Sequence, residues 1–118
     1  MLIEFEMISN DLDVNYKVFG RLDNNVLIFP DKSYPNTEMR VSIFENEIEI
    51  KRSGSVNMLQ TFILNKMCHG YYQNNQGINV KIASYTKKML VEENQIVIEY
   101  DYYLEYEWQS SNKLKIIF

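Results

Sequence analysis

Residues 95–109 read QIVIEYDYYLEYEWQ, and their side chains alternate strictly in character. Every even position carries an apolar or aromatic side chain, whereas four of the odd positions carry a carboxylate. Because successive side chains on a β-strand point to opposite faces, this pattern predicts an antiparallel sheet with one buried and one solvated face. A straight strand of this length would reach roughly 45 Å, so we expect the stretch to bend, bulge or turn.

Shorter runs with the same alternation occupy most of the chain, separated by polar or glycine-containing turns. The strands predicted from them cover residues 1–8, 13–19, 26–29, 38–44, 47–51, 56–62, 78–82, 86–92, 95–109 and 113–118. Strands at intervals of about 8–12 residues are typical of an all-β sandwich or barrel. We therefore predict one domain over residues 1–118, without linker, repeat or low-complexity tract.

Two connecting segments and one ambiguous segment complete this interpretation. A turn is predicted at residues 10–11, and the loop Pro30–Asn36, which holds both prolines, could cap one mouth of a barrel. Residues 57–68 fit helical spacing as well as strand alternation. Their Thr61, Phe62 and Ile63 favour strand, which is our prediction.

Composition indicates a globular protein and argues against several functions. Hydrophobic residues make up 46% of the chain and charged residues 24%, which argues against disorder. The net charge of −4 has the wrong sign for a duplex nucleic-acid binder, and no apolar run reaches membrane-spanning length. The protein is therefore predicted to bind neither nucleic acid nor membrane. A single cysteine, Cys68, and an N-terminus without a basic region predict a cytoplasmic location.

A series of features from residue 47 onward carries a resemblance to a known family. EIEIKRSGSVNMLQTF is followed by Tyr72, Gly77, Thr86 and the tail YDYYLEYEWQSSNKLKIIF. This order resembles the YwiB-like family of small, uncharacterised bacterial proteins. The resemblance implies a calycin-like (lipocalin-like) fold, an antiparallel up-and-down β-barrel of about eight to ten strands. It implies no catalytic residue, because none is established for the family.

Arg52 and the aromatic face of residues 100–108 are the candidate ligand-binding residues. An arginine on the same face as Ile48 and Ile50 can point into a cavity and bind a carboxylate, although a solvent-facing strand end or a hairpin glutamate is its ordinary interpretation. The aromatic side chains either fill the barrel or surround a small ligand, and core is the ordinary interpretation. The aromatic residues concerned are Tyr100, Tyr102, Tyr106 and Trp108.

No residue set in the sequence reaches a catalytic or metal-binding motif. His69 is the only histidine and adjoins Cys68, so neither a histidine-based metal site nor a nucleophile with an orienting partner is indicated. We expect no cofactor, no metal and no enzymatic activity, with a small barrel hydrolase or isomerase as a remote alternative. The hypothesis is a barrel that binds a small amphipathic or anionic molecule inside. The alternative is a filled barrel that forms a homodimer or contacts other proteins through its outer surface.

Overall fold

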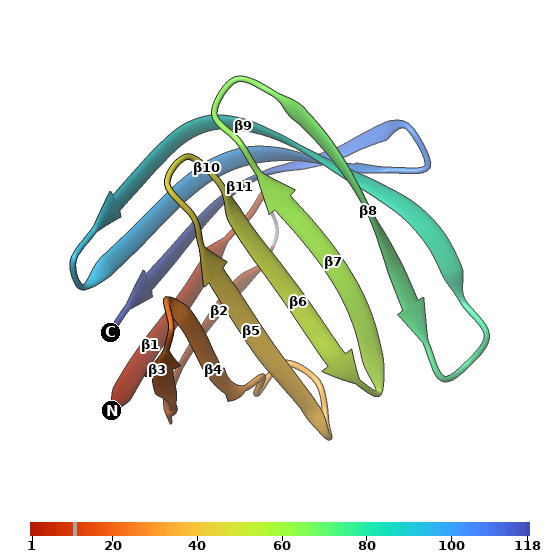
Figure 1. Cartoon of the computed structure of the whole chain (residues 1–118). Coiled ribbons are helices and arrows are strands. Elements are labelled where there is room, and N and C mark those ends of the chain that lie inside the picture. The colour runs from red at the N-terminus through yellow and green to blue at the C-terminus, as the bar shows by residue number, and fades with distance from the viewer. Residues whose placement is uncertain (11) are drawn as a thin grey trace.

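The alternating runs of the sequence fold into eleven antiparallel strands that form one curved sheet (Figure 1). The computed structural model describes residues 1–10 and 12–118, so half of the turn predicted at residues 10–11 lies outside the described residues. The strands are β1 (Leu2–Ile8), β2 (Asp13–Phe19), β3 (Arg21–Asp23), β4 (Val26–Pro30), β5 (Thr37–Ile43), β6 (Ile48–Gly54), β7 (Val56–Phe62), β8 (Met67–Asn74), β9 (Asn79–Glu92), β10 (Gln95–Leu104) and β11 (Glu107–Ile117).

The sheet curls into a nearly closed up-and-down barrel, which confirms the predicted fold class. Its strand order is β2-β1-β11-β10-β9-β8-β7-β6-β5-β4-β3, so β1 joins the two ends of the chain by pairing with both β2 and β11. The terminal strands of this order, β2 and β3, are linked through Gly20. A Cβ atom at Gly20 would lie 2.5 Å from the Ile28 carbonyl oxygen, so only glycine lets β2 pass this close to β4.

Several strand boundaries differ from those predicted. Residues 78–92 contain one long strand, β9, because the small residues Ala83 and Ser84 remain paired with neighbours on both sides. The segment 57–68 contains no helix among its residues: β7 ends at Phe62 and β8 begins at Met67. The strands β3 and β8 were not predicted. The described residues likewise contain no helix that could cross a membrane.

The opening stretch 95–109 is two strands joined by a tight turn. Its chain reverses at Glu105 and Tyr106, which have φ angles of 48° and 71°. Because of this turn and two register shifts along β10, the stretch does not form the single straight strand that its length would otherwise give.

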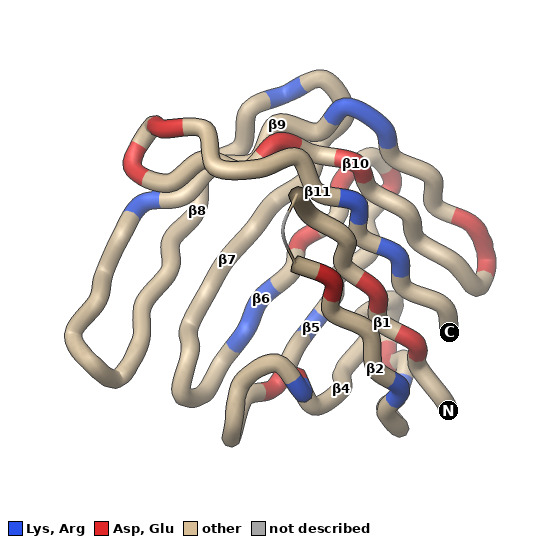
Figure 2. Tube along the Cα trace, turned by 180° about the vertical axis from the view of Figure 1, so that it is seen from behind, with Lys and Arg blue, Asp and Glu red and all other residues tan. Residues whose placement is uncertain are grey.

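Apolar side chains fill the barrel interior at one end, and charged side chains cover its outside. The core contains fully buried residues from most strands, including Ile3, Phe29, Ile48, Ile98 and Leu114. Figure 2 shows acidic and basic residues distributed along the strands and the turns between them. Cross-strand neighbours such as Glu6 and Lys115 bring opposite charges together on this surface.

Candidate functional site

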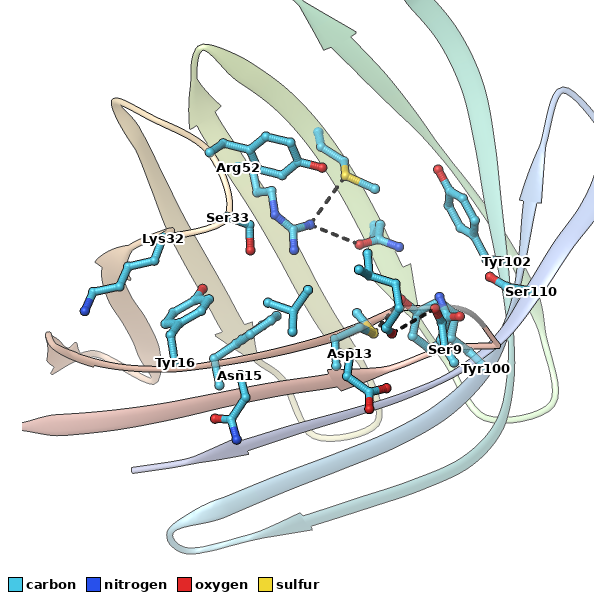
Figure 3. A pocket seen from close by; sticks show the side chains of 18 of the residues that line it. Ser9, Asp13, Asn15, Tyr16, Lys32, Ser33, Arg52, Tyr100, Tyr102 and Ser110 are labelled. Carbon is cyan, nitrogen blue, oxygen red and sulfur yellow. Dashed lines mark hydrogen bonds between the residues drawn. The ribbon is translucent and has the colours of Figure 1, made fainter.

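A cavity of about 680 Å³ occupies the end of the barrel that the apolar core does not fill (Figure 3). Its described lining comes from β1, β2, β6, β7, β8, β10 and β11, from Ser9 and Leu12 between β1 and β2, and from the loop between β4 and β5. That loop is the proline-containing segment expected to cap a barrel mouth, and its Lys32, Ser33 and Tyr34 border the cavity. The barrel is therefore filled at one end and hollow at the other.

Arg52 points into this cavity and forms a buried ion pair. Ile48, Ile50 and Arg52 alternate along β6, so all three face inward. The Arg52 Nε donates a hydrogen bond to Asp31 Oδ2 at 2.7 Å, and the two side chains are only 9% and 0% exposed. The ordinary interpretation of a solvent-facing arginine, or one paired with a hairpin glutamate, is therefore wrong. Arg52 can face inward near the end of β6 because the β4–β5 loop supplies a carboxylate there.

Asp31 also fastens the loop to the edge of the barrel. Its Oδ1 accepts hydrogen bonds from the Tyr16 hydroxyl at 3.1 Å and from the Ser33 amide at 2.9 Å. Tyr16 belongs to β2, so one carboxylate connects β2, β6 and the loop across the gap where the sheet edges meet. Neither β2 nor β6 neighbours β4 in the sheet order, so these side-chain bonds add to the closure of the barrel.

The guanidinium of Arg52 keeps hydrogen-bonding capacity beyond this ion pair. Its Nη1 donates to Met58 Sδ and to Gln60 Oε1, both at 3.4 Å. The Met58 thioether is a weak acceptor, and 3.4 Å is long for the hydrogen bond to the Gln60 oxygen. Within the described part of the chain, Nη2 takes part in no hydrogen bond. A bound carboxylate or carbonyl oxygen could therefore be received by the free edge of the guanidinium.

Five tyrosines surround the cavity: Tyr16, Tyr34, Tyr72, Tyr100 and Tyr102. Burial raises the pKa of Tyr16, Tyr34 and Tyr100, and it raises the pKa of Tyr102 to about 12. These phenols are consequently neutral near pH 7. Each offers an aromatic surface together with one hydroxyl that can donate or accept a hydrogen bond.

The structure brings together three of the five predicted ligand-binding residues. Arg52, Tyr100 and Tyr102 line the cavity, whereas Tyr106 is 73% exposed and Trp108 is 51% exposed. The prediction of a single aromatic face through residue 108 is therefore wrong beyond residue 104.

The turn between β10 and β11 explains this correction. Tyr106 lies in the turn itself, and Trp108 belongs to β11, where it pairs with Tyr103. Tyr103 has the opposite parity to Tyr100 and Tyr102, so Trp108 shares the outer face. The apolar or aromatic residues at every even position hid a chain reversal, and after that reversal an even position no longer means the inner face.

Four residues in or beside the cavity were not predicted as site residues: Asp31, Tyr16, Gln60 and Asn112. Asp31 had one local signal, because it is the only carboxylate in a loop already expected at a barrel mouth. Its pairing with Arg52, however, depends on how the sheet curls. Gln60 occupies an inward position of β7, where the other inward residues are apolar, and this break in alternation was available in the sequence. Asn112 carried no such signal, because the residues before it, Ser110 and Ser111, are polar as well.

Cys68 and His69 lie next to each other on β8, and neither lines this cavity. Among the described residues no three His, Cys, Asp or Glu side chains gather as metal ligands. The chemistry that the cavity offers is hydrogen bonding, one buried ion pair and aromatic surface.

A nearly closed antiparallel barrel with a side-chain-lined cavity at one mouth defines a calycin-like barrel protein. A family model described as "Domain of unknown function (DUF1934)" matches residues 4–116, and the chain belongs to this family. The crystal structure of the ywiB protein from Bacillus subtilis is similar, with a TM-score of 0.69 and 16% identity over 98% of this chain and 89% of that chain. The resemblance to the YwiB-like family is thereby confirmed. No curated protein matches the chain.

Proposed function

We propose that this barrel binds a small amphipathic or anionic molecule in its open end and does not catalyse a reaction on it. The observation that carries the proposal is the cavity itself, which combines a buried, incompletely bonded Arg52 with walls of tyrosine. Its volume of about 680 Å³ lies within the ~300–1,000 Å³ of small-molecule pockets.

The chemistry of the lining supports this proposal, because it offers a contact for each part of such a ligand. A carboxylate or carbonyl group would receive hydrogen bonds from the free edge of the Arg52 guanidinium, while Asp31 holds the other edge. The apolar body would contact the aromatic rings and Met58. Because Asp31 already neutralises Arg52, a neutral polar group can be accepted there as well as an anion.

Binding rather than catalysis is proposed because of how the lining groups are used. Asp31, a buried carboxylate beside the cavity, is already engaged by Arg52, Tyr16 and the Ser33 amide. General acid–base or nucleophilic chemistry needs a side chain that is free to exchange a proton or attack a substrate. Burial raises the pKa of Tyr16, Tyr34, Tyr100 and Tyr102, which suits these four residues to hydrogen bonding rather than to proton abstraction.

Anilinonaphthalene sulfonate, an amphipathic aromatic anion, is a direct probe of the cavity. We expect saturable binding with a rise in its fluorescence, and the Ser110→Trp substitution should weaken binding about tenfold or more, because an indole would fill the space that Ser110 borders. Gln109→Trp is the matched control, since Gln109 is the exposed neighbour on the same strand. Equal binding by the two variants, or none by the native chain, would contradict the proposal.

Native mass spectrometry of protein purified from its own host would then identify the physiological ligand. We expect an additional mass that disappears on denaturation and is absent from Ser110→Trp. The same additional mass on both proteins would place the bound molecule outside the cavity.

A homodimer formed through the sheet edge is the second candidate, and one observation favours it. Phe19 ends the terminal strand β2 and is 78% exposed, and Leu22 on β3 is exposed close by in sequence. Burial of these side chains and of a free strand edge would stabilise an association between copies. Light scattering after size exclusion should then give twice the monomer mass for the native chain and the monomer mass for Phe19→Ser.

A further inference from the structure

Residues 13–16 of β2 form a free edge of the sheet. β2 stands at one end of the sheet order and pairs with β1 alone. Gly20, which follows β2, exchanges both backbone hydrogen bonds with Met1, at 2.9 and 3.0 Å. Bonded and non-bonded pairs alternate along an antiparallel ladder, so the N–H and C=O groups of Asp13 and Asn15 point away from β1. Within the described part of the chain, these groups have no other hydrogen-bond partner.

The cavity runs along this edge. Successive residues of a strand point to opposite faces, yet all four residues 13–16 line the cavity. A cavity that contacts both faces of a strand must pass beside its edge, where the free N–H and C=O groups lie. Figure 3 shows Asp13, Asn15 and Tyr16 along β2, with Lys32 and Ser33 on the loop across from it. The cavity wall therefore includes unpaired main-chain donors and acceptors.

The opening beside β2 is closed at its inner end. The Tyr16 hydroxyl and Arg52 Nε bind the two oxygens of the Asp31 carboxylate, at 3.1 and 2.7 Å. Beyond this bridge, Gly20 brings β2 into contact with β4. A chain that enters from the mouth and follows the edge therefore ends beside Tyr16 and Arg52.

The Arg52 Nη2 atom is accessible at this point. Among the described residues, the fully buried side-chain nitrogen and oxygen atoms that lack a hydrogen bond are Thr86 Oγ1 and Asn112 Oδ1. Nη2 also lacks a hydrogen bond but is not one of these atoms, so it retains surface toward the cavity that Arg52 lines. An acceptor oxygen of a ligand can therefore reach it.

We propose that the ligand is the C-terminal end of an extended peptide, which adds to the sheet as a strand beside β2 and directs its terminal carboxylate at Arg52. This inference rests on the proposed ligand-binding function. Main-chain hydrogen bonds to Asp13 and Asn15 would hold the peptide, and its alternate side chains would enter the cavity. The Asp13 carboxylate would repel a second carboxylate at the mouth, which favours the orientation with the chain end at Arg52.

The dimensions of the site suit a peptide of three or four residues. Residues 13–16 extend roughly 10 Å, at about 3.4 Å per residue. The cavity volume of about 680 Å³ accommodates the side chains of such a segment. A fatty acid or an aromatic anion can bind Arg52, but neither offers main-chain groups to the free edge.

An N-acetylated tetrapeptide of alternating threonine and valine, with a free C-terminal carboxylate, is the test probe, because both residue types favour strands. Calorimetric titration into the native chain should give a Kd of about 10–100 µM. The C-terminal amide of the same peptide should bind about tenfold more weakly, because it lacks the charge directed at Arg52. Of two analogues N-methylated on alternate amides, one should bind about tenfold more weakly and the other should retain most of the affinity, since only alternate N–H groups face β2.

The Asn15→Pro substitution tests the same contact from the protein side. It removes an N–H that faces the free edge and no hydrogen bond to β1, and proline is tolerated at such positions of edge strands. We expect it to raise the Kd of the peptide about tenfold, and to weaken the peptide more than anilinonaphthalene sulfonate. Asn15→Ala is the matched variant, because it removes the side chain and keeps the N–H, and it should bind the peptide more tightly than Asn15→Pro. Thermal unfolding of both variants checks that they fold.

The outcomes separate this inference from the proposed function. Sulfonate binding without peptide binding would overturn the peptide assignment and leave cavity binding standing. Equal affinities of the two N-methylated analogues, or of Asn15→Pro and Asn15→Ala, would overturn strand addition, and equal affinities of the acid and the amide would overturn the place of the carboxylate. A native dimer that Asn15→Pro dissociates would assign the edge to a second copy of the chain and overturn the inference as well. Failure of both probes would contradict the proposed function itself.

Discussion

The two ends of the barrel are formed by the same strands, but the inward-facing residues at the two ends differ in chemistry. Along β10 the inward residues run Ile96, Ile98, Tyr100 and Tyr102. Along β6 they run from Ile48 and Ile50 to Arg52, and along β11 the inward positions change from Leu114 to Asn112. In each strand, polarity rises toward the same mouth. The filled end contributes apolar packing, whereas the open end contributes the Arg52–Asp31 ion pair and the cavity.

Truncation of a core aromatic should have the largest effect on this comparison. We expect Phe62→Ala to lower the free energy of unfolding by about 3–5 kcal/mol, because it leaves a cavity among fully buried residues. Urea denaturation measures the change.

Tyr72→Ala is the counterpart at the open end. Tyr72 already borders a cavity and is only half-buried, so its truncation should cost about 1 kcal/mol or less. Similar losses for Phe62→Ala and Tyr72→Ala would mean that the two ends do not differ in packing.

Arg52→Ala should be nearly as destabilising as Phe62→Ala, although Arg52 belongs to the open end. Removal of the guanidinium leaves the Asp31 carboxylate buried without its counter-ion, which costs about 3 kcal/mol. The double variant Arg52→Met/Asp31→Asn removes both charges and keeps an amide oxygen for Tyr16 and the Ser33 amide. It should recover most of the lost stability in the same denaturation experiment.

The double variant also separates stability from binding. We expect it to fold and still lose affinity for anilinonaphthalene sulfonate, because the guanidinium is absent. Full affinity in a folded double variant would show that Arg52 serves the fold alone.

The stability of the open end should also fall at alkaline pH. In the folded chain the pKa of Tyr102 is raised to about 12, above the value of about 10 for an exposed phenol. The unfolded chain therefore releases this proton first as pH rises, so stability is fully present below about pH 10 and decreases between about pH 10 and 12. Burial shifts the pKa of Tyr16, Tyr34 and Tyr100 in the same direction.

Denaturation at a series of alkaline pH values, with ultraviolet absorption of ionised tyrosine, measures this loss. Tyr102→Phe is the control, and its stability should fall less steeply with pH. An identical slope for native protein and variant would place the titrating tyrosines elsewhere.

Local alternation predicted the fold, and curvature decided the site. The strand pattern and the strand character of residues 57–62 follow from the periodicity of the side chains, which is encoded over a few residues. That periodicity left sandwich or barrel open, and the resemblance to the YwiB-like family implied the barrel. Arg52 was recognised as a candidate because its parity continues that of Ile48 and Ile50. Its partner Asp31 lies 21 residues away and not on a neighbouring strand, so only the closed barrel brings them together.

The errors have physical causes of the same kind. Trp108 and Tyr106 were assigned to the aromatic face because their parity matched that of Tyr100, but the turn at residues 105–106 reverses the chain. A turn of two non-glycine residues at positive φ carries little sequence signal. Conversely, residues 110–112 were predicted to separate two strands, although β11 runs through them and Asn112 lines the cavity.

The smallest expected effect concerns an ion pair on the outside of the same barrel. The stability lost when this pair is broken is the reference against which the loss of the buried Arg52–Asp31 pair is judged. Lys87 Nζ lies 3.1 Å from Asp101 Oδ1, and both side chains remain in contact with solvent. Partial burial alone would raise the Asp101 pKa, but hydrogen bonds from Ser111 and Lys87 and the lysine charge outweigh it and lower the pKa. Lys87→Ala should therefore raise the Asp101 pKa measured by NMR titration, yet reduce stability at neutral pH by less than about 1 kcal/mol, and by less still in high salt. Water and salt screen the outer pair and leave the Arg52–Asp31 pair nearly unaffected. A loss as large as that of Arg52→Ala would therefore mean that burial does not distinguish the two pairs.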